Sequence, residues 1–550
     1  MPTFKIDGKD VPFEKGDTIL RAAYRAGIDI PYYCWHPGLS VAANCRMCLV
    51  EILPPPGRPP MLLDVLELDR KTGQYVNTRK PKLQPACQVP AAENLDVLSD
   101  TSEHVLRARH AVQEFLLLNH PVDCPICDQA GECKLQDYWL EHMGTAKRML
   151  DEPVHKPKAV SFGPTIVYDA ERCIVCTRCV RFCEEVAKDP VLSVRERGNV
   201  NEITVSPGRQ LDHPYTFMTE HVCPVGALTT KDFRFKARVW FLRSAKAICQ
   251  GCATGCNAWL DFDPRYQRAY RYRPRDNEKV NEFWMCDEGM LSYRTAHDDR
   301  ITQARVGGKK TQLAKAVTKA AEAIREGSTD KAAIVLSAQH SCEDNFALVA
   351  LAKALGIKAW YVAGKPDGEG DDILRHVDKN PNTAGARLVA GKDLGSFEDL
   401  TKAIEDGTVK HVIAIGSALP REDVDAQLKR LDTLVVIASW ASALSRHADV
   451  FLPACSWAEA HGLYVNAKGI AQESQRAILG ADDAQPAWKV LGDVSRALGH
   501  EPAWKKLGEL RAAMPEACLP EPEKPASAVA EDNPDANGGA AEKAEASADS

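Results

Sequence analysis

Nineteen cysteines are the most informative residues of this 550-residue chain. Sixteen of them lie before residue 290, mostly in tight groups, and only Cys342, Cys455 and Cys518 follow. Cysteines of small secreted domains form disulfides, but such chains are short and carry an export signal. Here the N-terminus has no basic segment followed by an apolar one, so we expect no signal peptide. Grouped cysteines in a long chain of a reducing compartment are predicted to bind metal.

The first group is Cys34, Cys45 and Cys48, with Cys87 returning from a distant segment. Three close thiolates and one remote thiolate are the plant-ferredoxin arrangement for a [2Fe–2S] cluster. A zinc site would use a C-x-x-C pair at both ends, and only one pair occurs here. The spacing therefore predicts a [2Fe–2S] cluster.

The second group holds only three cysteines, Cys124, Cys127 and Cys133. A [4Fe–4S] cluster needs four protein ligands. His120 stands where Pro121 ends a predicted helix, and a histidine at a helix end is more often a cap. Because the cysteines fall one short of a set, we predict that His120 is the fourth ligand.

The third group begins with a C-x-x-C-x-x-C run that can bind three corners of a [4Fe–4S] cluster, namely Cys173, Cys176 and Cys179. The fourth corner could come from Cys183 or Cys223. In two-cluster ferredoxins the fourth cysteine of a run precedes proline. Since Cys223 precedes Pro224 and Cys183 precedes Glu184, we assign Cys223 as the ligand and Cys183 as a bystander thiol.

Three arginines, Arg172, Arg178 and Arg181, flank the third group. Positive charge beside a cluster should raise its reduction potential. The alternative is that these arginines belong to a solvated surface.

The fourth group is C-x-x-C-x-x-x-C with one cysteine thirty positions later: Cys249, Cys252, Cys256 and Cys286. This pattern is typical of a [4Fe–4S] site, and zinc is the alternative.

The elements before the first group favour a ferredoxin fold. Residues 4–6 and 11–13 read as strands around an Asp7-Gly8 turn. A helix should follow, with Asp17 as its N-cap and Gly27 just past its end, and with these buried positions: Ile19, Ala22, Ala23 and Ala26. A Pro-rich stretch over residues 53–60 is predicted to be a surface loop.

A second helix is predicted over residues 102–119. Its apolar positions fall at helical spacing: Val105, Ala108, Val112, Phe115 and Leu116. After about residue 305, apolar runs at 332–336, 412–416 and 434–438 alternate with helical patterns such as residues 346–355. This alternation predicts a parallel α/β layer. Beyond about residue 520 the chain is mostly Ala, Glu, Pro, Asp and Ser, and we expect disorder.

The net charge of -7 is mild, and no basic run indicates nucleic acid. No stretch of 18 apolar residues occurs, so a membrane contact would have to come through other proteins. The chain also has no Gly-rich dinucleotide fingerprint, so it offers redox centres and no predicted place for NADH.

The order of these motifs resembles the large iron–sulfur subunit of the NADH dehydrogenase module of respiratory complex I, called the G subunit in bacterial NADH–quinone oxidoreductase. The matching motifs are Cys34-x10-Cys45-Arg-Met-Cys48, His120-Pro-x-Asp-Cys124-x-x-Cys127 with Gly131-Glu-Cys133, Arg172-Cys-Ile-x-Cys-x-Arg-Cys-Val-Arg-Phe182, and Cys223-Pro-Val-Gly-Ala-Leu-Thr229. The resemblance runs from about residue 3 to about residue 300. It continues more weakly to about residue 500, where residues 448–453 and 462–466 look like the end of a molybdopterin-oxidoreductase domain.

The resemblance implies an electron relay. Electrons from the flavin of a partner subunit would pass through the [2Fe–2S] cluster, the Cys173 cluster and the His120 cluster toward quinone, with proton translocation in the whole complex. The Cys249–Cys286 cluster would match an extra [4Fe–4S] cluster off the main path. The C-terminal domain looks too short to enclose a pterin, so neither molybdenum nor pterin is expected. Cys342 and Cys455 read as small buried thiols.

The resemblance also implies a multidomain α+β and α/β fold. The expected domains are a plant-type (β-grasp) [2Fe–2S] ferredoxin domain at 1–100, a helical [4Fe–4S] domain with one histidine and three cysteine ligands at 101–150, a bacterial-ferredoxin-like [4Fe–4S] domain at 151–240, a [4Fe–4S] domain of molybdopterin-oxidoreductase type at 241–304, a degenerate molybdopterin-oxidoreductase-like α/β domain at 305–512 and a disordered acidic tail at 513–550.

The implied partners are other hydrophilic complex I subunits: a flavin- and NADH-binding subunit, a small [2Fe–2S] subunit, a ferredoxin-like subunit with two [4Fe–4S] clusters and the quinone-site subunits. The implied location is the peripheral arm on the cytoplasmic side of a bacterial inner membrane. The chain would act as an enzyme only as part of this oxidoreductase, with no substrate site of its own.

Other assignments predict further sequence features. An iron-only hydrogenase needs more cysteine motifs after about residue 300, and only single cysteines occur there. The electron-transfer subunit of an NAD-linked nickel hydrogenase should end soon after residue 240. A molybdenum formate dehydrogenase needs a complete cofactor domain. A zinc scaffold would lack the brown colour of iron–sulfur clusters.

Overall fold

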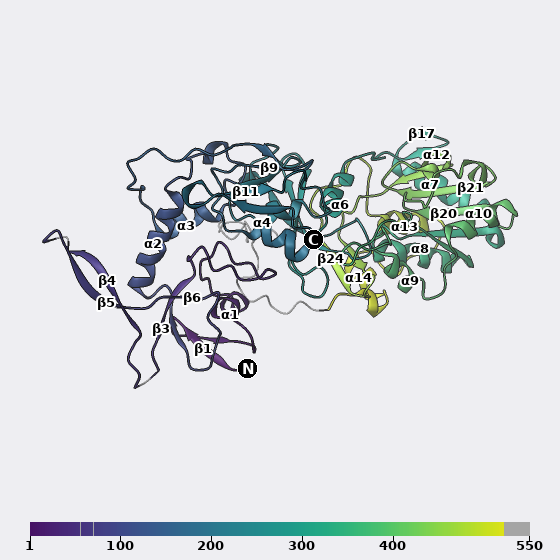
Figure 1. The fold of residues 1–550 in the computed structure, drawn as a ribbon. Helices are drawn as coiled ribbons and strands as arrows, with labels where there is room; N and C mark the ends of the chain where they lie inside the picture. Colours follow the sequence, from purple (N-terminus) through teal and green to yellow (C-terminus); the bar gives the residue numbers. More distant parts are fainter. Residues whose placement is uncertain (56, 70, 522–550) are drawn as a thin grey trace. The chain divides into compact units, whose positions relative to one another are not determined.

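The computed structural model describes residues 1–55, 57–69 and 71–521 (Figure 1). Of the tail expected at 513–550, residues 522–550 lie outside the described residues. The chain divides into two compact units, one from Met1 to Trp240 and one that begins at Phe241. No helix among the described residues is long and apolar enough to cross a membrane.

The first unit opens with a five-stranded sheet and one helix, α1 (Ile19–Ala26). The strand order is β2 (Lys9–Pro12), β1 (Thr3–Ile6), β7 (Asp96–Leu98), β3 (Leu49–Leu53) and β6 (Gln84–Pro85). Strands β1 and β7 are parallel, and the other three pairings are antiparallel. The predicted strand–turn–strand–helix order is therefore confirmed.

The N-cap of α1 is Thr18, so the prediction of Asp17 is wrong. The Thr18 side chain accepts a hydrogen bond from the Arg21 amide, whereas the buried Asp17 carboxylate accepts from the Glu14 amide at 2.8 Å and from Arg25 at 3.1 Å. Gly27 ends the helix in the left-handed conformation, as predicted. Of the predicted buried face, Ala26 is only partly buried.

An unpredicted β-hairpin follows the Pro-rich loop. Strands β4 (Leu62–Asp69) and β5 (Gln74–Pro81) form a separate two-stranded antiparallel sheet. Its apolar side chains, among them Leu66, Leu68 and Tyr75, are exposed. Apolar and polar residues alternate on both sides of a Thr72-Gly73 turn, and this pattern could have predicted the hairpin.

Helices α2 (Glu103–Leu117) and α3 (Lys134–His142) frame the second cysteine group, with a short 3-10 turn at Cys124–Ile126. The predicted apolar face of α2 is partly wrong, because Phe115 is 72% exposed. The fully buried positions are Val105, Arg109 and Gln113, which lie four residues apart. Polar side chains can occupy this buried face because Arg109 and Gln113 form hydrogen bonds with other residues of the first unit.

The rest of the first unit consists of short elements around the third group. Strands β12 (Leu228–Thr230), β9 (Ile166–Tyr168) and β8 (Val160–Ser161) form one antiparallel sheet, and β10 (Leu192–Arg195) pairs with β11 (Glu202–Val205). The helices are α4 (Arg178–Arg181), a π-helical turn (Phe182–Val186) and α5 (Phe217–His221).

The second unit begins with a three-stranded antiparallel sheet that carries the fourth group. Its strands are β13 (Arg243–Ile248), β14 (Asn257–Asp263) and β15 (Arg268–Pro274), followed by α6 (Asp287–Leu291). Buried Asp261 of β14 binds Arg271 and Arg273 of β15, each with an Oδ2–Nε distance of 2.7 Å. The two guanidinium groups hold the pKa of this carboxyl below its usual range, against its burial.

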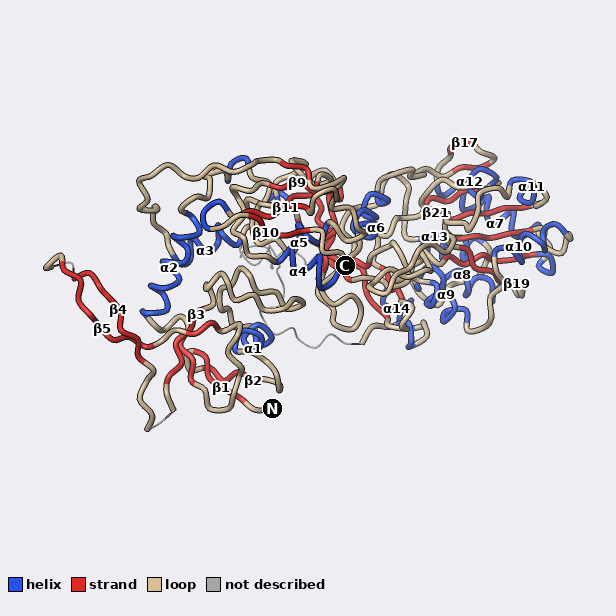
Figure 2. The backbone as a smooth tube through the Cα atoms, viewed as in Figure 1, coloured by secondary structure: helices blue, strands red, loops and turns tan. Residues whose placement is uncertain are grey.

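A seven-stranded sheet forms the α/β layer, and Figure 2 shows its strands flanked by helices. The strand order is β17 (Lys309–Lys310), β16 (Arg305–Val306), β22 (Val450–Pro453), β21 (Thr433–Ala438), β20 (His411–Ile415), β18 (Ala332–Ser337) and β19 (Ala359–Ala363). The five strands from β22 to β19 are parallel. The three predicted strands and the parallel layer are confirmed.

Helices cover both faces of this sheet, because alternate strand residues enter two separate cores. Val435 and Ile437 of β21 enter one core, and Leu434 and Val436 enter the other. The helices are α7 (Leu313–Glu326), α8 (Cys342–Leu355), α9 (Thr383–Ala390), α10 (Phe397–Glu405), α11 (Asp425–Leu428), α12 (Ala443–His447), α13 (Ala487–Ala497) and α14 (Leu507–Ala512), and β23 (Gly462–Val465) pairs with β24 (Ala471–Ser474).

Candidate iron–sulfur sites

The first group gathers in loops that leave the N-terminal sheet. Cys34, Cys48 and Cys87 are buried and Cys45 is partly buried. The thiols of Cys34 and Cys45 are hydrogen-bonded, and so are those of Cys48 and Cys87. The turn from Ala43 to Arg46 contains two left-handed residues, which bring Cys45 back toward Cys34. Cys48 and Cys87 belong to the apolar core of this domain, and the four thiols together form a donor set that suits a [2Fe–2S] cluster.

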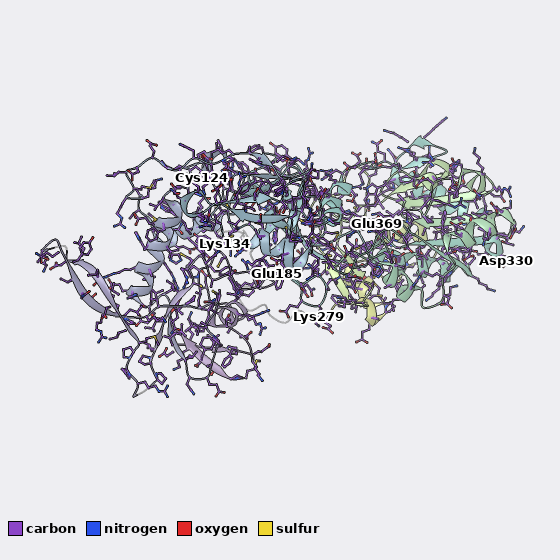
Figure 3. The ribbon with its side chains drawn as sticks, viewed as in Figure 1. Cys124, Lys134, Glu185, Lys279, Asp330 and Glu369 are labelled. Atoms are coloured by element: carbon purple, nitrogen blue, oxygen red, sulfur yellow. The ribbon has the colours of Figure 1, made fainter. Side chains whose placement is uncertain are left out.

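The second group lines one cavity together with its histidine. His120, Cys124, Cys127 and Cys133 all border it, and it has about 1270 Å³ of empty space, part of which is open solvent. The buried His120 Nδ1 has no hydrogen-bond partner among the described residues, and burial lowers the pKa of this ring to about 4. A neutral, unpartnered imidazole suits a metal ligand. Cys124, labelled in Figure 3, is exposed.

The third group lines a smaller cavity of about 310 Å³ with four cysteines: Cys173, Cys176, Cys179 and Cys223. Left-handed residues at Val175 and Thr177 curl the run around this space. Burial raises the pKa of Cys173, Cys176 and Cys223 to about 11. Thiolates here would need a cation to offset their burial, and the iron of a cluster supplies such charge.

Cys183 lies apart from this cavity lining. It is buried in the π-helical turn, and its sulfur lies 3.6 Å from Nε2 of His213. Burial raises the pKa of its thiol to about 12.

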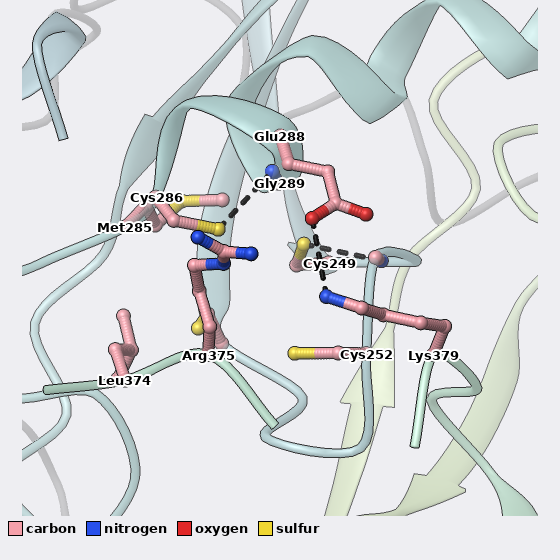
Figure 4. A pocket seen from close by; sticks show the side chains of 11 residues that line it. Cys249, Cys252, Met285, Cys286, Glu288, Gly289, Leu374, Arg375 and Lys379 are labelled. Atoms are coloured by element: carbon pink, nitrogen blue, oxygen red, sulfur yellow. Dashed lines mark hydrogen bonds and ion pairs between the residues drawn. The ribbon is translucent and has the colours of Figure 1, made fainter. Parts of the chain in front are cut away.

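The fourth group lines a cavity of the second unit, again with about 310 Å³ of empty space (Figure 4). Cys249, Cys252, Cys256 and Cys286 are all buried around it. The amide of Gly251 donates to the Cys249 sulfur at 3.4 Å, and the amide of Gly289 donates to the Cys286 sulfur at 3.3 Å. A side chain at Gly289 would press on two of the sulfurs, so the backbone forms a cradle for them.

The three arginines beside the third group are buried, so the alternative of a solvated surface is wrong. Arg172 pairs with Asp123 at 3.0 Å. Arg178 donates to the backbone carbonyls of Val222 and Trp35. Sequence spacing could not predict these partners, because they come from distant segments.

Buried polar contacts connect the first three groups. Arg181 donates to the carbonyl of Cys34 at 2.5 Å and to the carbonyl of Cys176 at 3.4 Å, so it bridges the first and third groups. Gln113 bridges the first and second, since it accepts from the Tyr33 hydroxyl at 2.6 Å and donates to the Leu135 carbonyl at 3.0 Å. At the surface, Glu185 accepts from Ser40 (Figure 3).

The second and third groups meet at a glycine. A Cβ on Gly226 would collide with the Cys127 sulfur and with Gln129, so only glycine fits here. The Lys134 amide also donates to the Pro224 carbonyl at 3.1 Å. The third group therefore contacts both of the others. The sequence alone does not indicate that residue 226 must be glycine, apart from its place in the Cys-Pro-Val-Gly motif.

The remaining cysteines are buried thiols in the α/β layer. Cys342 and Cys518 are fully buried and hydrogen-bonded to each other. Cys518 belongs to a 3-10 turn (Glu516–Cys518), so the part of the expected tail before residue 522 contains structure. Cys455 borders a pocket with His340 and Tyr464. Among the described residues, no group of three or more His, Cys, Asp or Glu is arranged to hold a single metal ion.

The fold and these groups define a class of chain in which iron–sulfur binding domains precede a molybdopterin-oxidoreductase-like domain. Four family models match it: a 2Fe-2S iron–sulfur cluster binding domain at 1–102, the NADH-ubiquinone oxidoreductase-G iron–sulfur binding region at 109–146, the ferredoxin-like domain of NADH-quinone oxidoreductase subunit 3 at 163–229 and molybdopterin oxidoreductase at 303–497. The chain thus contains both 2Fe–2S and 4Fe–4S domains.

Curated relatives carry a more particular name. The chain is 34% identical over 366 residues to the NADH-quinone oxidoreductase G subunit of Rickettsia felis, covering 66% of this chain and 50% of that protein. It is 38% identical over 288 residues to the NADH-ubiquinone oxidoreductase 75 kDa subunit of Reclinomonas americana, covering 52% and 38%. The resemblance predicted from the cysteine motifs is confirmed, and the chain spans only about a third to a half of the length of such relatives.

Among solved structures, this chain is similar to a chain of an NAD+-reducing [NiFe]-hydrogenase in the H2-reduced state. The two are 29% identical, with a TM-score of 0.35. That match covers 43% of this chain and 91% of the other. A similarity this weak carries no conclusion about function.

Proposed function

We propose that this chain is the iron–sulfur electron-transfer subunit of an NADH–quinone oxidoreductase of the complex I type. It receives single electrons from the flavin of a partner subunit and passes them toward quinone, while proton translocation belongs to the whole complex. Bound clusters supply the one-electron oxidation and reduction, and the chain positions and insulates them. It has no substrate site of its own.

Four ligand sets hold one [2Fe–2S] cluster and three [4Fe–4S] clusters in this proposal. They are Cys34, Cys45, Cys48 and Cys87 for [2Fe–2S]; His120, Cys124, Cys127 and Cys133; Cys173, Cys176, Cys179 and Cys223; and Cys249, Cys252, Cys256 and Cys286. The proposal includes no pterin or molybdenum, although a molybdopterin oxidoreductase model matches residues 303–497.

The observation that carries the proposal is the connection of the first three groups through buried contacts. Arg181 joins the first group to the third, and Gly226 allows the third to approach the second. In this proposal electrons pass in the same order, from the first group to the third and then to the second. Fixed contacts keep the separations between the sites constant, which a chain of electron transfers requires.

The proposed partners are the flavin- and NADH-binding subunit, the small [2Fe–2S] subunit, the ferredoxin-like subunit with two [4Fe–4S] clusters and the quinone-site subunits. The proposed location is the peripheral arm on the cytoplasmic side of the inner membrane. The similarity to bacterial NADH-quinone oxidoreductase subunits supports an assembly with other subunits of such an oxidoreductase.

Anaerobic purification of the full chain, with and without its partners, tests the proposal. We expect about fourteen iron atoms and matching sulfide per chain. His120→Ala should remove one [4Fe–4S] signal from low-temperature electron paramagnetic resonance (EPR) spectra, and the purified complex should catalyse NADH-dependent quinone reduction.

A reproducible plateau near ten iron atoms would mean that one ligand set is wrong. Unchanged spectra of His120→Ala would make this histidine structural. Co-purification with a hydrogenase subunit, together with hydrogen-dependent reduction of NAD, would replace complex I by the hydrogenase alternative.

A further inference from the structure

The fourth cysteine group is covered by a loop of the α/β layer. Residues 371–379 contribute Leu374, Arg375 and Lys379 to the cavity lining, whereas the three aspartates of this loop do not border the cavity. The loop is called here the cationic lid after its two lining cations. The four cysteines border the same cavity. Nothing in the cysteine spacing predicts this loop, which comes almost ninety residues after Cys286.

Hydrogen bonds fasten the lid to the cysteine loop. The Ala253 amide donates to the Asp378 carbonyl at 2.8 Å, and the Thr254 hydroxyl donates to the Leu374 carbonyl at 2.6 Å. Both donors lie between two ligand cysteines, Cys252 and Cys256. The position of the lid is therefore tied to the loop that shapes the cavity.

The lid brings two positive charges to the cavity wall. Figure 4 shows the Arg375 side chain extending into the cavity toward Cys286, and Lys379 in contact with Glu288. The Lys379 Nζ–Glu288 Oε2 distance is 3.2 Å. Arg375 reaches Glu369 at 3.3 Å, but that carboxylate lies in a side chain that is 89% exposed.

The inner side of the Arg375 guanidinium faces the Asp371 carboxylate, with an Nε–Oδ2 distance of 4.0 Å that is too long for a hydrogen bond. Its buried Nε has no hydrogen-bond partner among the described residues. A buried guanidinium nitrogen without a partner is costly unless negative charge lies nearby. Asp371 supplies one such charge. Four thiolates around an iron–sulfur core would add to it, because their negative charge exceeds the positive charge of the core.

We propose that the cationic lid compensates the negative charge of the cluster bound by the fourth group, and that Arg375 raises the reduction potential of that cluster. This inference depends on the proposed ligand role of Cys249, Cys252, Cys256 and Cys286. Reduction adds an electron to an already negative cluster, so a nearby fixed cation stabilises the reduced form more than the oxidised form. Arg375 acts here as a tuning residue and contacts no substrate.

A redox titration of the full chain with its clusters, followed by EPR, tests the proposal. The signal of the fourth cluster is first identified as the one that Cys286→Ser removes. In Arg375→Met, the ratio of reduced to oxidised cluster at a fixed potential should fall by about tenfold, which corresponds to about 59 mV for one electron. Arg375→Lys should retain most of the wild-type potential because it keeps the charge.

Two further variants keep the test decisive if Arg375→Met binds its cluster poorly. Lys379→Met should lower the potential, and Glu288→Gln should raise it, because the first removes a cation and the second removes an anion. Arg387→Met is the matched control, since Arg387 is an exposed residue of α9 that does not border this cavity. Its potential should equal that of the wild type.

The lid proposal fails if Arg375→Met, Lys379→Met and Arg387→Met all titrate at the wild-type potential. It also fails if Glu288→Gln shifts the potential in the same direction as Lys379→Met. A wild-type chain without any signal that depends on Cys286 would overturn the ligand assignment itself. The two failures are therefore distinguishable.

Discussion

Gly226 and Cys127 illustrate how closely two metal sites can approach when a side chain is missing. The Cys127 sulfur occupies the space that a Cβ of residue 226 would need. Gly226 also belongs to the segment that begins at Cys223, which borders the cavity of the third group. One glycine therefore determines the packing between the second and third groups.

Gly226→Ala should displace Cys127 and weaken or remove the EPR signal of the cluster in the second group. The reason is a steric overlap that no rotation of the new methyl group can relieve. The control is Gly508→Ala, because a Cβ there meets nothing within 4 Å. Equal iron content and equal spectra for the two variants would show that the backbone at 226 adjusts without cost.

Serine substitutions at Cys223 and Cys183 distinguish the two candidates for the fourth corner. Cys223 borders the cavity and Cys183 does not. We expect Cys223→Ser to lose the signal of the third cluster and Cys183→Ser to keep it, with about four iron atoms separating the two proteins. The reverse pattern would overturn the assignment.

At this scale the ligand residues could be predicted from spacing, because each run of cysteines is local in sequence. Their supporting residues could not. Arg181 contacts Cys34 across 147 positions, and Arg375 borders a site that begins at Cys249. Such contacts depend on how distant loops pack, and a single sequence carries no record of that packing.

Elements were predicted well where one residue pattern decides them. The buried strands β18, β20 and β21 follow from short apolar runs between helices. The position of helix α2 could be predicted but its buried face could not. Gln113 is held by the distant residues Tyr33 and Leu135, and Arg109 donates to Ser99 in the segment before the helix. Periodicity assumes that apolar residues face inward, and buried polar contacts violate that assumption.

The sheet of β13, β14 and β15 should depend on the Asp261 carboxylate. Removing its charge with Asp261→Asn leaves Arg271 and Arg273 without their common anion, and breaking a buried ion pair costs about 3–5 kcal/mol. We expect a clearly lower denaturant midpoint for the second unit. Glu398→Gln is the control, since its ion pair with Arg421 is partly exposed and should contribute at most about 1 kcal/mol. Similar midpoints for both variants would contradict the argument.

At the scale of the whole chain, the ligand sets are distributed unevenly between the two compact units. The first three groups lie before Trp240, and the fourth lies in the unit that begins at Phe241. No ligand set combines cysteines from both units. The contacts that connect the first three groups also lie within the first unit.

This distribution makes a prediction about fragments 1–240 and 241–521. Each contains complete ligand sets and its own buried core, so each should fold and bind clusters separately. We expect about ten iron atoms in the first fragment and about four in the second. Only the first should show a [2Fe–2S] signal. Iron and sulfide analysis with EPR measures both. A soluble, folded second fragment without iron would show that its cavity needs the other unit, and a [2Fe–2S] signal there would contradict the assignment of the first group.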